Sequence, residues 1–333
     1  MTTRRSSGPR PMNVFVRPGS KAELACRRYA AGEKVEPKEP PPHSEVIAAG
    51  FTPRKALNLV DHDGKIIREL VYTNFFVGGN AWDKQDIQRI DENLEKAMTD
   101  QHLNNVLVQY FRGAPNITST FRPSSILPGK PDTISQPEVE TLVSKLHSQG
   151  KLTGFDFPNT VFNFMLPRGT VLTIDDGSGD EAKPKRKGRS GPTEEEASSL
   201  EGLGGFHGSV HIGATTLYYA VGVFSEGSNG IVAFDQPWKN VVATFYHELV
   251  EARTDADVED NRVAWVNNER PSEEIGDIPM TLAGDNLSKV MKEVPLADGS
   301  GTVPIQLMWS NAVAGPERPI ATPHAQDLHA VHA

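Results

Sequence analysis

The chain has 333 residues, of which 37% are hydrophobic and 23% charged, and its formal net charge is −9. Its single cysteine, Cys26, excludes an intramolecular disulfide, a cysteine-based zinc site and an iron–sulfur scaffold. The longest apolar runs, such as 217–221, are much shorter than the ~20 residues that cross a bilayer, so no membrane span is expected. Arg4 and Arg5 are followed by polar residues and prolines instead of an apolar stretch, which predicts a cytoplasmic protein without a signal peptide.

Three stretches have compositions that do not favour burial in a core. Residues 1–44 hold nine basic residues against four glutamates and are rich in proline, so a disordered basic leader is expected. Residues 175–201 carry separate basic and acidic blocks, typical of a surface insertion, and no aromatic residue to stack on bases, so no nucleic-acid partner is expected. With a disordered tail at 316–333, the sequence predicts one domain over 45–315.

The spacing of apolar residues in that domain indicates both strands and helices. Strands are expected at 66–73, 105–110, 160–166, 206–212, 217–224, 230–234 and 303–309, and amphipathic helices at 83–98 and 136–149. The order predicts an α/β or α+β domain with a mixed sheet, and periodicity does not distinguish these two classes.

A further helix, expected over 235–255, carries the residues with recognisable chemistry. Asp235 is the expected N-cap, and Pro237 falls in the first turn. One apolar stripe should face the core, and it consists of Trp238, Val241, Val242, Phe245 and Leu249. A second stripe is polar, and it consists of Asn240, Thr244, His247 and Glu251.

The polar stripe contains a His-Glu-x-x-Glu pentapeptide. Residues i and i+4 project from one face of a helix, so His247 and Glu251 can direct ligand atoms at one ion. Glu248 lies beside them and is the candidate base that takes a proton from a water acidified by the metal. The same pentapeptide also arises by chance on solvated helix faces. Here it lies on an otherwise apolar helix, where ionisable groups are costly to bury without a partner.

A third metal ligand is needed, and the sequence offers more than one. The segment 271–278 has a Glu followed after three or four residues by an Asp, which resembles the glutamate zincins. In those proteins the Glu binds the metal and the Asp orients the first histidine. We therefore expect Glu274 as a ligand and Asp277 behind it, with Glu273 and Asp257 as alternative ligands.

These segments together resemble a known family. Residues 247–255, Trp265 and 274–277 are similar to the core of the exordium, or phosphate-induced, proteins of plants and their bacterial relatives. Residues 205–208 and 218–220 resemble the strand that precedes the helix in that family. Bacterial members look like zincin-type metallopeptidases, so the resemblance implies a zincin-like fold and a metallopeptidase activity.

The family implies a site as well as a fold. Its metal set corresponds to His247, Glu251 and Glu274, and its base to Glu248. This chain departs from the family pattern at Ala256, where a proline is usual, and it lacks a cysteine soon after position 277. Plant members are described as secreted, so the resemblance would allow export.

The ligand set also bears on the metal. Zinc is expected, but two carboxylates and one imidazole leave Zn²⁺ formally neutral, which acidifies its water less than a cationic centre. Oxygen-rich ligation also admits Mn²⁺ or Ca²⁺. His207 and His211 lie four apart on one face of a strand, and we expect His207 to stabilise an oxyanion or hold substrate. Ordinary strand histidines are the alternative for both.

The sequence therefore predicts a metal-dependent hydrolase, most simply a zinc peptidase acting on a peptide or protein substrate. The alternative is a non-catalytic, metal-stabilised protein that binds a peptide or glycan.

Overall fold

The computed structural model describes residues 12–16, 47–174, 198–258, 262–270, 273–284 and 286–324. The helices are α2 (Lys84–Thr99), α3 (Gln101–Leu107), α4 (Gln136–Ser148), α5 (Pro237–Thr254) and α6 (Asp277–Ala283). The longer strands are β1 (Met12–Phe15), β3 (Glu69–Val77), β4 (Thr118–Leu127), β6 (Thr160–Leu166), β8 (Leu203–Ile212), β9 (Thr215–Val223), β11 (Met291–Pro295) and β12 (Thr302–Gln306). The shorter strands are β2 (Val60–Asp61), β5 (Thr133–Ser135), β7 (Val171–Thr173), β10 (Trp265–Val266), β13 (Trp309–Ser310) and β14 (Gly315–Pro316).

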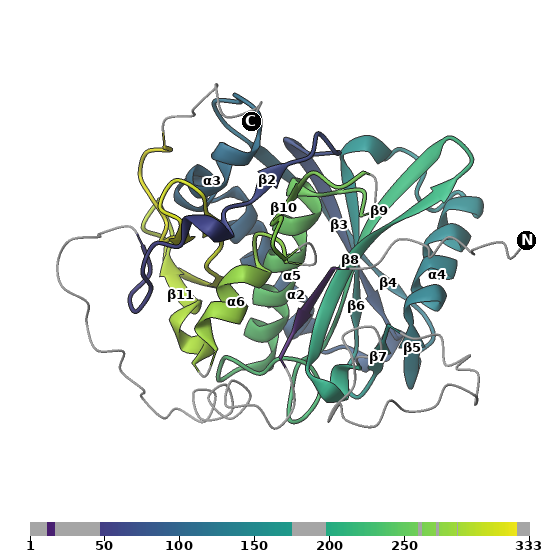
Figure 1. Cartoon of the computed structure of the whole chain (residues 1–333). Helices are drawn as coiled ribbons and strands as arrows, with labels where there is room; N and C mark the ends of the chain where they lie inside the picture. Colours follow the sequence, from purple (N-terminus) through teal and green to yellow (C-terminus); the bar gives the residue numbers. More distant parts are fainter. Residues whose placement is uncertain are drawn as a thin grey trace, which may run out of the picture.

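A mixed sheet of six strands, in the order β1-β8-β9-β6-β3-β4, forms the centre of the fold (Figure 1). The strands β9, β6, β3 and β4 pair in parallel, whereas β8 is antiparallel to both β9 and β1. The prediction of a mixed α/β domain with a mixed sheet is confirmed.

The two faces of the sheet bury separate clusters of apolar side chains. Along β3, Tyr72 and Phe76 pack with α2, α3 and α5, while Phe75 packs with α4 on the opposite face. This alternation follows from the period of two in a strand. In Figure 1, α5 accordingly lies between the sheet and the group of elements that includes α6 and β11. The strand β12 packs against α5 as well.

Several elements agree with the sequence predictions, and two do not. The expected strand at 160–166 is β6, and α2 begins after the N-cap Asp83, which accepts a hydrogen bond from the Gln85 amide. The strand expected at 105–110 is wrong. The chain is helical there because Asp100 caps α3 by accepting from the amide of Leu103 at 2.9 Å.

The strand expected at 230–234 is also wrong. The amides of Ala233 and Phe234 donate to Oδ1 of Asn240, and the amide of Ile231 donates to the hydroxyl of Ser225. Side chains thus take the backbone donors that a neighbouring strand would need.

The domain boundaries differ from expectation at two places. The strand β1 lies within the segment 1–44 that was expected to be a disordered leader. At the other end, Glu317 is buried, and the amide of Ile320 donates to the carbonyl of His102. Most of 1–44, residues 175–197 of the predicted insertion and residues 325–333 lie outside the described residues.

Candidate metal centre

Helix α5 carries the His-Glu-x-x-Glu segment through the interior. Its N-cap is Gln236, and Pro237 occupies the first turn. Asp235, the expected N-cap, instead binds the ammonium group of Lys239 at 2.9 Å, so that prediction is wrong. The side chain of Asn240 fixes the entry to the helix through the two amides described above.

The polar stripe of α5 is buried rather than solvated. The side chains of His247, Glu248 and Glu251 are all 0% exposed. Nε2 of His247 lies 3.0 Å from Oε2 of Glu251, as the i, i+4 spacing predicts. Nitrogen and oxygen ligands of zinc lie ~2.0–2.2 Å from the ion, so two atoms 3.0 Å apart can share one ion.

Gln306, at the end of β12, fixes the orientation of the His247 ring. Nε2 of Gln306 donates to the carbonyl of Gly276 at 2.6 Å, which directs Oε1 of the amide toward Nδ1 of His247 at 3.0 Å. A carbonyl oxygen only accepts, so Nδ1 of His247 carries the hydrogen. The lone pair of a neutral His247 is then on Nε2, facing the Glu251 carboxylate, as in metal-binding histidines.

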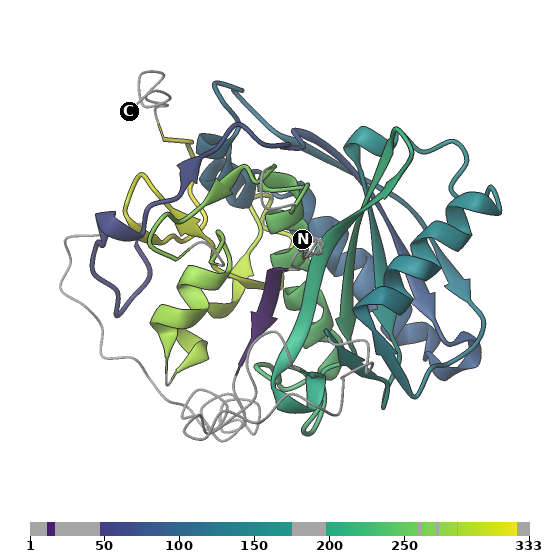
Figure 2. The same cartoon turned by 45° about the vertical axis from the view of Figure 1, so that its right-hand side comes forward.

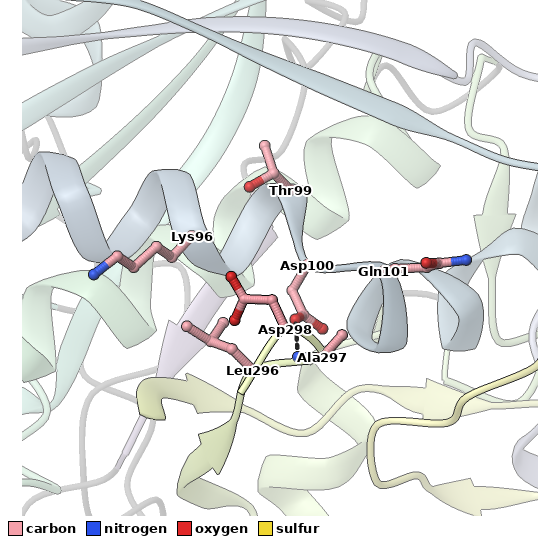
Figure 3. A pocket seen from close by; sticks show the side chains of 7 residues that line it. All are labelled: Lys96, Thr99, Asp100, Gln101, Leu296, Ala297 and Asp298. Carbon is pink, nitrogen blue, oxygen red and sulfur yellow. Dashed lines mark hydrogen bonds between the residues drawn. The ribbon is translucent and has the colours of Figure 1, made fainter. Parts of the chain in front are cut away.

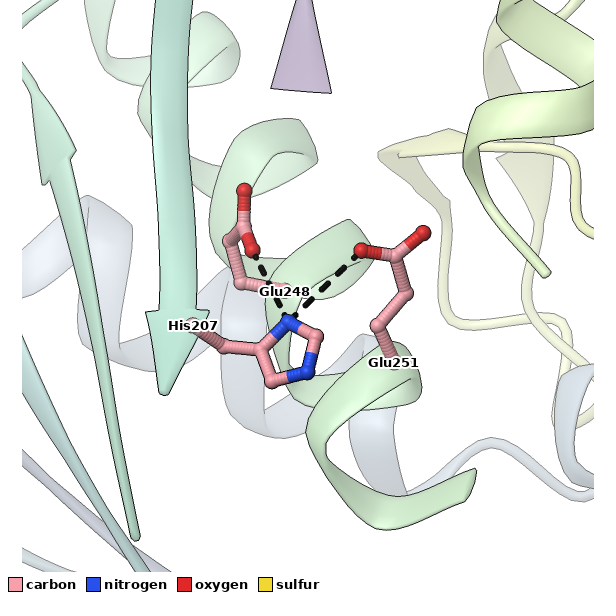
Figure 4. A group of neighbouring side chains, drawn as sticks. All are labelled: His207, Glu248 and Glu251. Carbon is pink, nitrogen blue, oxygen red and sulfur yellow. Dashed lines mark ion pairs between the residues drawn. The ribbon is translucent and has the colours of Figure 1, made fainter. Parts of the chain in front are cut away.

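His207 on β8 repeats this arrangement from the sheet side. Its Nε2 lies 3.2 Å from the backbone carbonyl of Asp255, which can only accept, so Nε2 carries the hydrogen. Its Nδ1 points between two carboxylates, 3.6 Å from Oε2 of Glu248 and 3.8 Å from Oε2 of Glu251 (Figure 4). The side chain of His207 is fully buried.

The segment just before α6 completes the buried cluster that His207, His247, Glu248 and Glu251 form. The amide of Gly276 donates to Oε1 of Glu251 at 3.0 Å. A Cβ on Gly276 would lie 2.4 Å from Nδ1 of His247 and 2.8 Å from Oε1 of Glu251. Only glycine therefore lets the backbone come this close to the pair.

Glu274 and Asp277 lie on different sides of the cluster. Oδ1 of Asp277 lies 3.8 Å from Nε2 of His247, whereas Oε2 of Glu274 lies 3.6 Å from Nε2 of His207. The sequence placed Glu274 next to the ion and Asp277 behind it. In the structure, it is Asp277 whose carboxylate lies near both His247 and Glu251, with one ligand atom of each residue within 4.8 Å of the others.

The remaining sequence candidates have other partners. Asp257 accepts hydrogen bonds from Ser209 at 2.9 Å and pairs with His211 at 3.0 Å. Glu273 pairs with Arg270 at 3.0 Å. Among the described residues, the sets of side chains whose ligand atoms lie close enough to share one metal ion include neither Asp257 nor Glu273.

The cluster concentrates negative charge in the interior. Its five buried carboxylates are Glu248, Glu251, Asp255, Glu274 and Asp277. Burial, together with the neighbouring carboxylates, raises the pKa of Glu274 and Asp277 well above the ordinary range, and burial raises the pKa of Asp255 to about 7. Such groups need protons or cations when they are enclosed.

The Glu251–His247 pair shows the opposite tendency. Burial disfavours the charged form of each group, but their mutual attraction outweighs burial. It lowers the pKa of Glu251 and raises the pKa of His247. The charged forms of these two side chains therefore stabilise each other.

Two groups of side chains meet the distance requirements of a metal site. One comprises His207, Glu248 and Glu251, and the other comprises His247, Glu251 and Asp277. Imidazole and carboxylate are zinc ligands, and both groups are buried, so this cluster can hold a metal ion.

A separate hollow of about 340 Å³ lies at the junction of α2 and α3 with the turn after β11 (Figure 3). Its lining residues are Lys96, Thr99, Asp100, Gln101, Leu296, Ala297 and Asp298, none of which belongs to the cluster. Oδ2 of Asp100 accepts from the Ala297 amide at 2.6 Å and thereby joins its two sides.

The sequence patterns did not predict two groups that orient the histidines of the cluster, the side chain of Gln306 and the backbone carbonyl of Asp255. Gln306 is a single polar residue within the apolar run 303–309, and it is fully buried. A buried polar side chain needs a hydrogen-bond partner, so this interruption was the available signal. A backbone carbonyl leaves no such signal.

Comparison of the chain with protein-family models, with curated proteins and with solved structures finds no match. Among the described residues, no helix combines the length and the apolar character that crossing a bilayer requires.

Proposed function

We propose that the chain is a metal-dependent hydrolase of zincin-like fold, related to the exordium-like metallopeptidases, and that zinc is its metal. The observation that carries the proposal is the pair formed by His247 Nε2 and Glu251 Oε2, 3.0 Å apart in a fully buried site. With Nδ1 of His247 donating to Gln306, this pair directs the Nε2 lone pair and a carboxylate oxygen at one point, an arrangement that suits a cation.

Each residue of the site has a defined part in the proposed reaction. His247, Glu251 and Asp277 would hold the ion. Glu274, the third ligand expected from the sequence, lies on the side of His207 instead. When bound, the ion supplies Lewis acidity to polarise a carbonyl and acidify water. Glu248 follows His247 on the helix and is also buried. We assign to its carboxylate the role of accepting the proton of the attacking water and returning it to the leaving amine.

A peptide is the substrate that the surrounding sheet suits best. The strand β8 carries His207, and β1 lies antiparallel along its outer edge (Figure 2). In the register of the two strands, Met12 is opposite His207. This edge, which β1 occupies in the structure, is thus one that can pair with an extended chain next to the cluster. Peptides commonly bind by adding a strand to such an edge.

The experiment compares wild-type protein with Glu248→Gln. The expected result is that the variant keeps the ion bound through His247 but loses cleavage of a diverse peptide library, since an amide does not accept the proton. Metal analysis of the purified proteins and peptide mass spectrometry measure both properties. Wild-type turnover in Glu248→Gln would exclude the assigned mechanism.

The complete burial of the cluster favours a second candidate, a metal-stabilised protein that binds a peptide or glycan without cleaving it. All three α5 side chains are 0% exposed, whereas a hydrolase must admit a substrate carbonyl and water. Under this alternative, chelation lowers the melting temperature and no peptide of the library is cleaved. Detected cleavage that depends on added metal would exclude it.

A further inference from the structure

The two ligand groups of the cluster meet at one atom. Oε2 of Glu251 lies 3.0 Å from Nε2 of His247 and 3.8 Å from Nδ1 of His207. The other oxygen of Glu251 accepts from the amide of Gly276, so the carboxylate cannot turn without losing that bond. One fixed oxygen thus faces two imidazoles that come from different elements, β8 and α5.

His207 has the features of a metal ligand rather than of a structural histidine. Its Nε2 is used by the backbone carbonyl of Asp255, while its Nδ1 is buried and has no hydrogen-bond partner among the described residues. Figure 4 shows this nitrogen between the carboxylates of Glu248 and Glu251. Leaving such a nitrogen unpaired costs free energy, and a histidine anchored through one nitrogen commonly binds metal through the other.

The charges of the cluster also exceed what one ion balances. When Glu251, Asp255, Glu274 and Asp277 are all ionised, one divalent cation leaves two of their negative charges unbalanced, and two cations balance all four. Among the described residues, no lysine or arginine forms an ion pair with Glu251, Asp255, Glu274 or Asp277. Arg253, the buried arginine of α5, is instead directed at the carbonyls of Ile67, Arg68 and Thr118.

We infer that the cluster binds two divalent cations that share Glu251, one with His247 and Asp277 and the other with His207 and Oε2 of Glu248, while Oε1 of Glu248 keeps the role of proton acceptor. The inference rests on the proposed function for the first ion and assigns His207 to a second. Each position offers one nitrogen and two carboxylates, a set that suits Zn²⁺ or Mn²⁺. Pairs of ions ~3.5–4 Å apart occur in many hydrolases, where both stabilise the attacking and leaving groups.

Metal stoichiometry tests the inference without any substrate. The full-length protein is stripped with a chelator and titrated calorimetrically with Zn²⁺. Wild type is expected to bind two equivalents, and His207→Ala and Asp277→Asn are each expected to bind one. His211→Ala is the matched control, since His211 lies on the same face of β8 but pairs with Asp257, and it should bind two. One equivalent in wild type, or two in His207→Ala, would overturn the inference.

A second measurement uses wild type alone and therefore does not depend on a variant folding. Two equivalents of Mn²⁺ should give the electron paramagnetic resonance spectrum of an exchange-coupled pair, because the ions share a carboxylate. Two uncoupled signals would overturn the inference. Cleavage of the peptide library by a protein that saturates at a single bound equivalent would support the hydrolase and remove the second ion. Two bound equivalents without cleavage would support the second ion and remove the hydrolase.

Discussion

The amide of Gln306 and the imidazole of His247 are joined by a hydrogen bond of 3.0 Å, and the other end of that amide is fixed by the carbonyl of Gly276. The strand β12 thereby sets which nitrogen of His247 faces Glu251. The orientation of the His247 ring therefore depends on how β12 packs against α5, and not on α5 alone.

Replacement of Gln306 by Leu should weaken metal binding by about 10–100-fold, because His247 loses the acceptor that fixes its ring and its tautomer. Competition with a chromogenic chelator measures the affinity. Gln109→Leu is the control, since Gln109 bonds the carbonyl of Val106 and the hydroxyl of Ser310 away from the cluster. Equal affinities in the two variants would contradict the role given to Gln306.

Gly276→Ala should abolish metal binding and lower stability. The added Cβ would lie 2.4 Å from Nδ1 of His247, so the ring or the loop must move. Gly213→Ala provides the comparison: its φ of 62° makes alanine cost ~1–2 kcal/mol, but no atom lies near its Cβ. Thermal unfolding with and without metal separates the two effects. A metal-dependent rise in melting temperature that persists in Gly276→Ala would refute the prediction.

In the metal-free protein, Asp255 should contribute a loss of stability as the pH rises from about 4 to about 7. Burial raises the pKa of Asp255 from 3.8 to about 7, so the folded state favours its protonated form. A raised folded-state pKa gives a contribution that is complete below the unfolded pKa and is lost as pH rises through the folded one. Urea unfolding of the chelated protein measures this slope. Asp255→Asn keeps an oxygen for the Ala264 amide and should show a smaller slope; identical slopes would assign the effect elsewhere.

Removal of residues 1–15 should raise the rate of peptide cleavage at low substrate concentration. The strand β1 occupies the edge of β8 that an extended peptide would use, and its removal leaves that edge open. A chain lacking only residues 1–11 keeps β1 and is the control. Values of kcat/KM for one cleaved peptide decide the matter, and equal values for both truncations would show that the peptide binds elsewhere.

Arg253→Lys should destabilise the protein nearly as much as Arg253→Ala. The guanidinium group is fully buried and donates to the carbonyls of Arg68 at 2.8 Å and Thr118 at 3.0 Å, a fork that an ammonium group does not reproduce. Hydrogen bonds from charged groups contribute ~1.5–3 kcal/mol each, so a loss of about 3 kcal/mol or more is expected. Chemical denaturation gives the value, and full rescue by lysine would show that charge alone suffices.

The sequence was most informative where neighbours along the chain are also neighbours in space. The i, i+4 relation of His247 and Glu251 follows from helix geometry and could be predicted without any tertiary contact. The expected helix at 83–98 and the expected strand at 160–166 follow from local periodicity in the same way.

The rest of the cluster depends on packing between distant segments. Whether Glu274 or Asp277 faces His247 is decided by the path of the Gly276 loop over the ring, which no pattern of residue types encodes. The partner of His207 Nε2 is a backbone carbonyl 48 residues away, and that of His247 Nδ1 is an amide 59 residues away. Such pairs appear only once the sheet, α5 and β12 are assembled.

Glu251 joins helix, strand and loop at a single carboxylate, and this has a consequence for biosynthesis. Segments that are far apart along the chain bring like charges to one place, where they repel until a cation arrives. The supply of divalent ions around a newly made chain should therefore influence how much of it reaches the native state. Cells depleted of such ions would be expected to accumulate less of this protein, whatever its catalytic output.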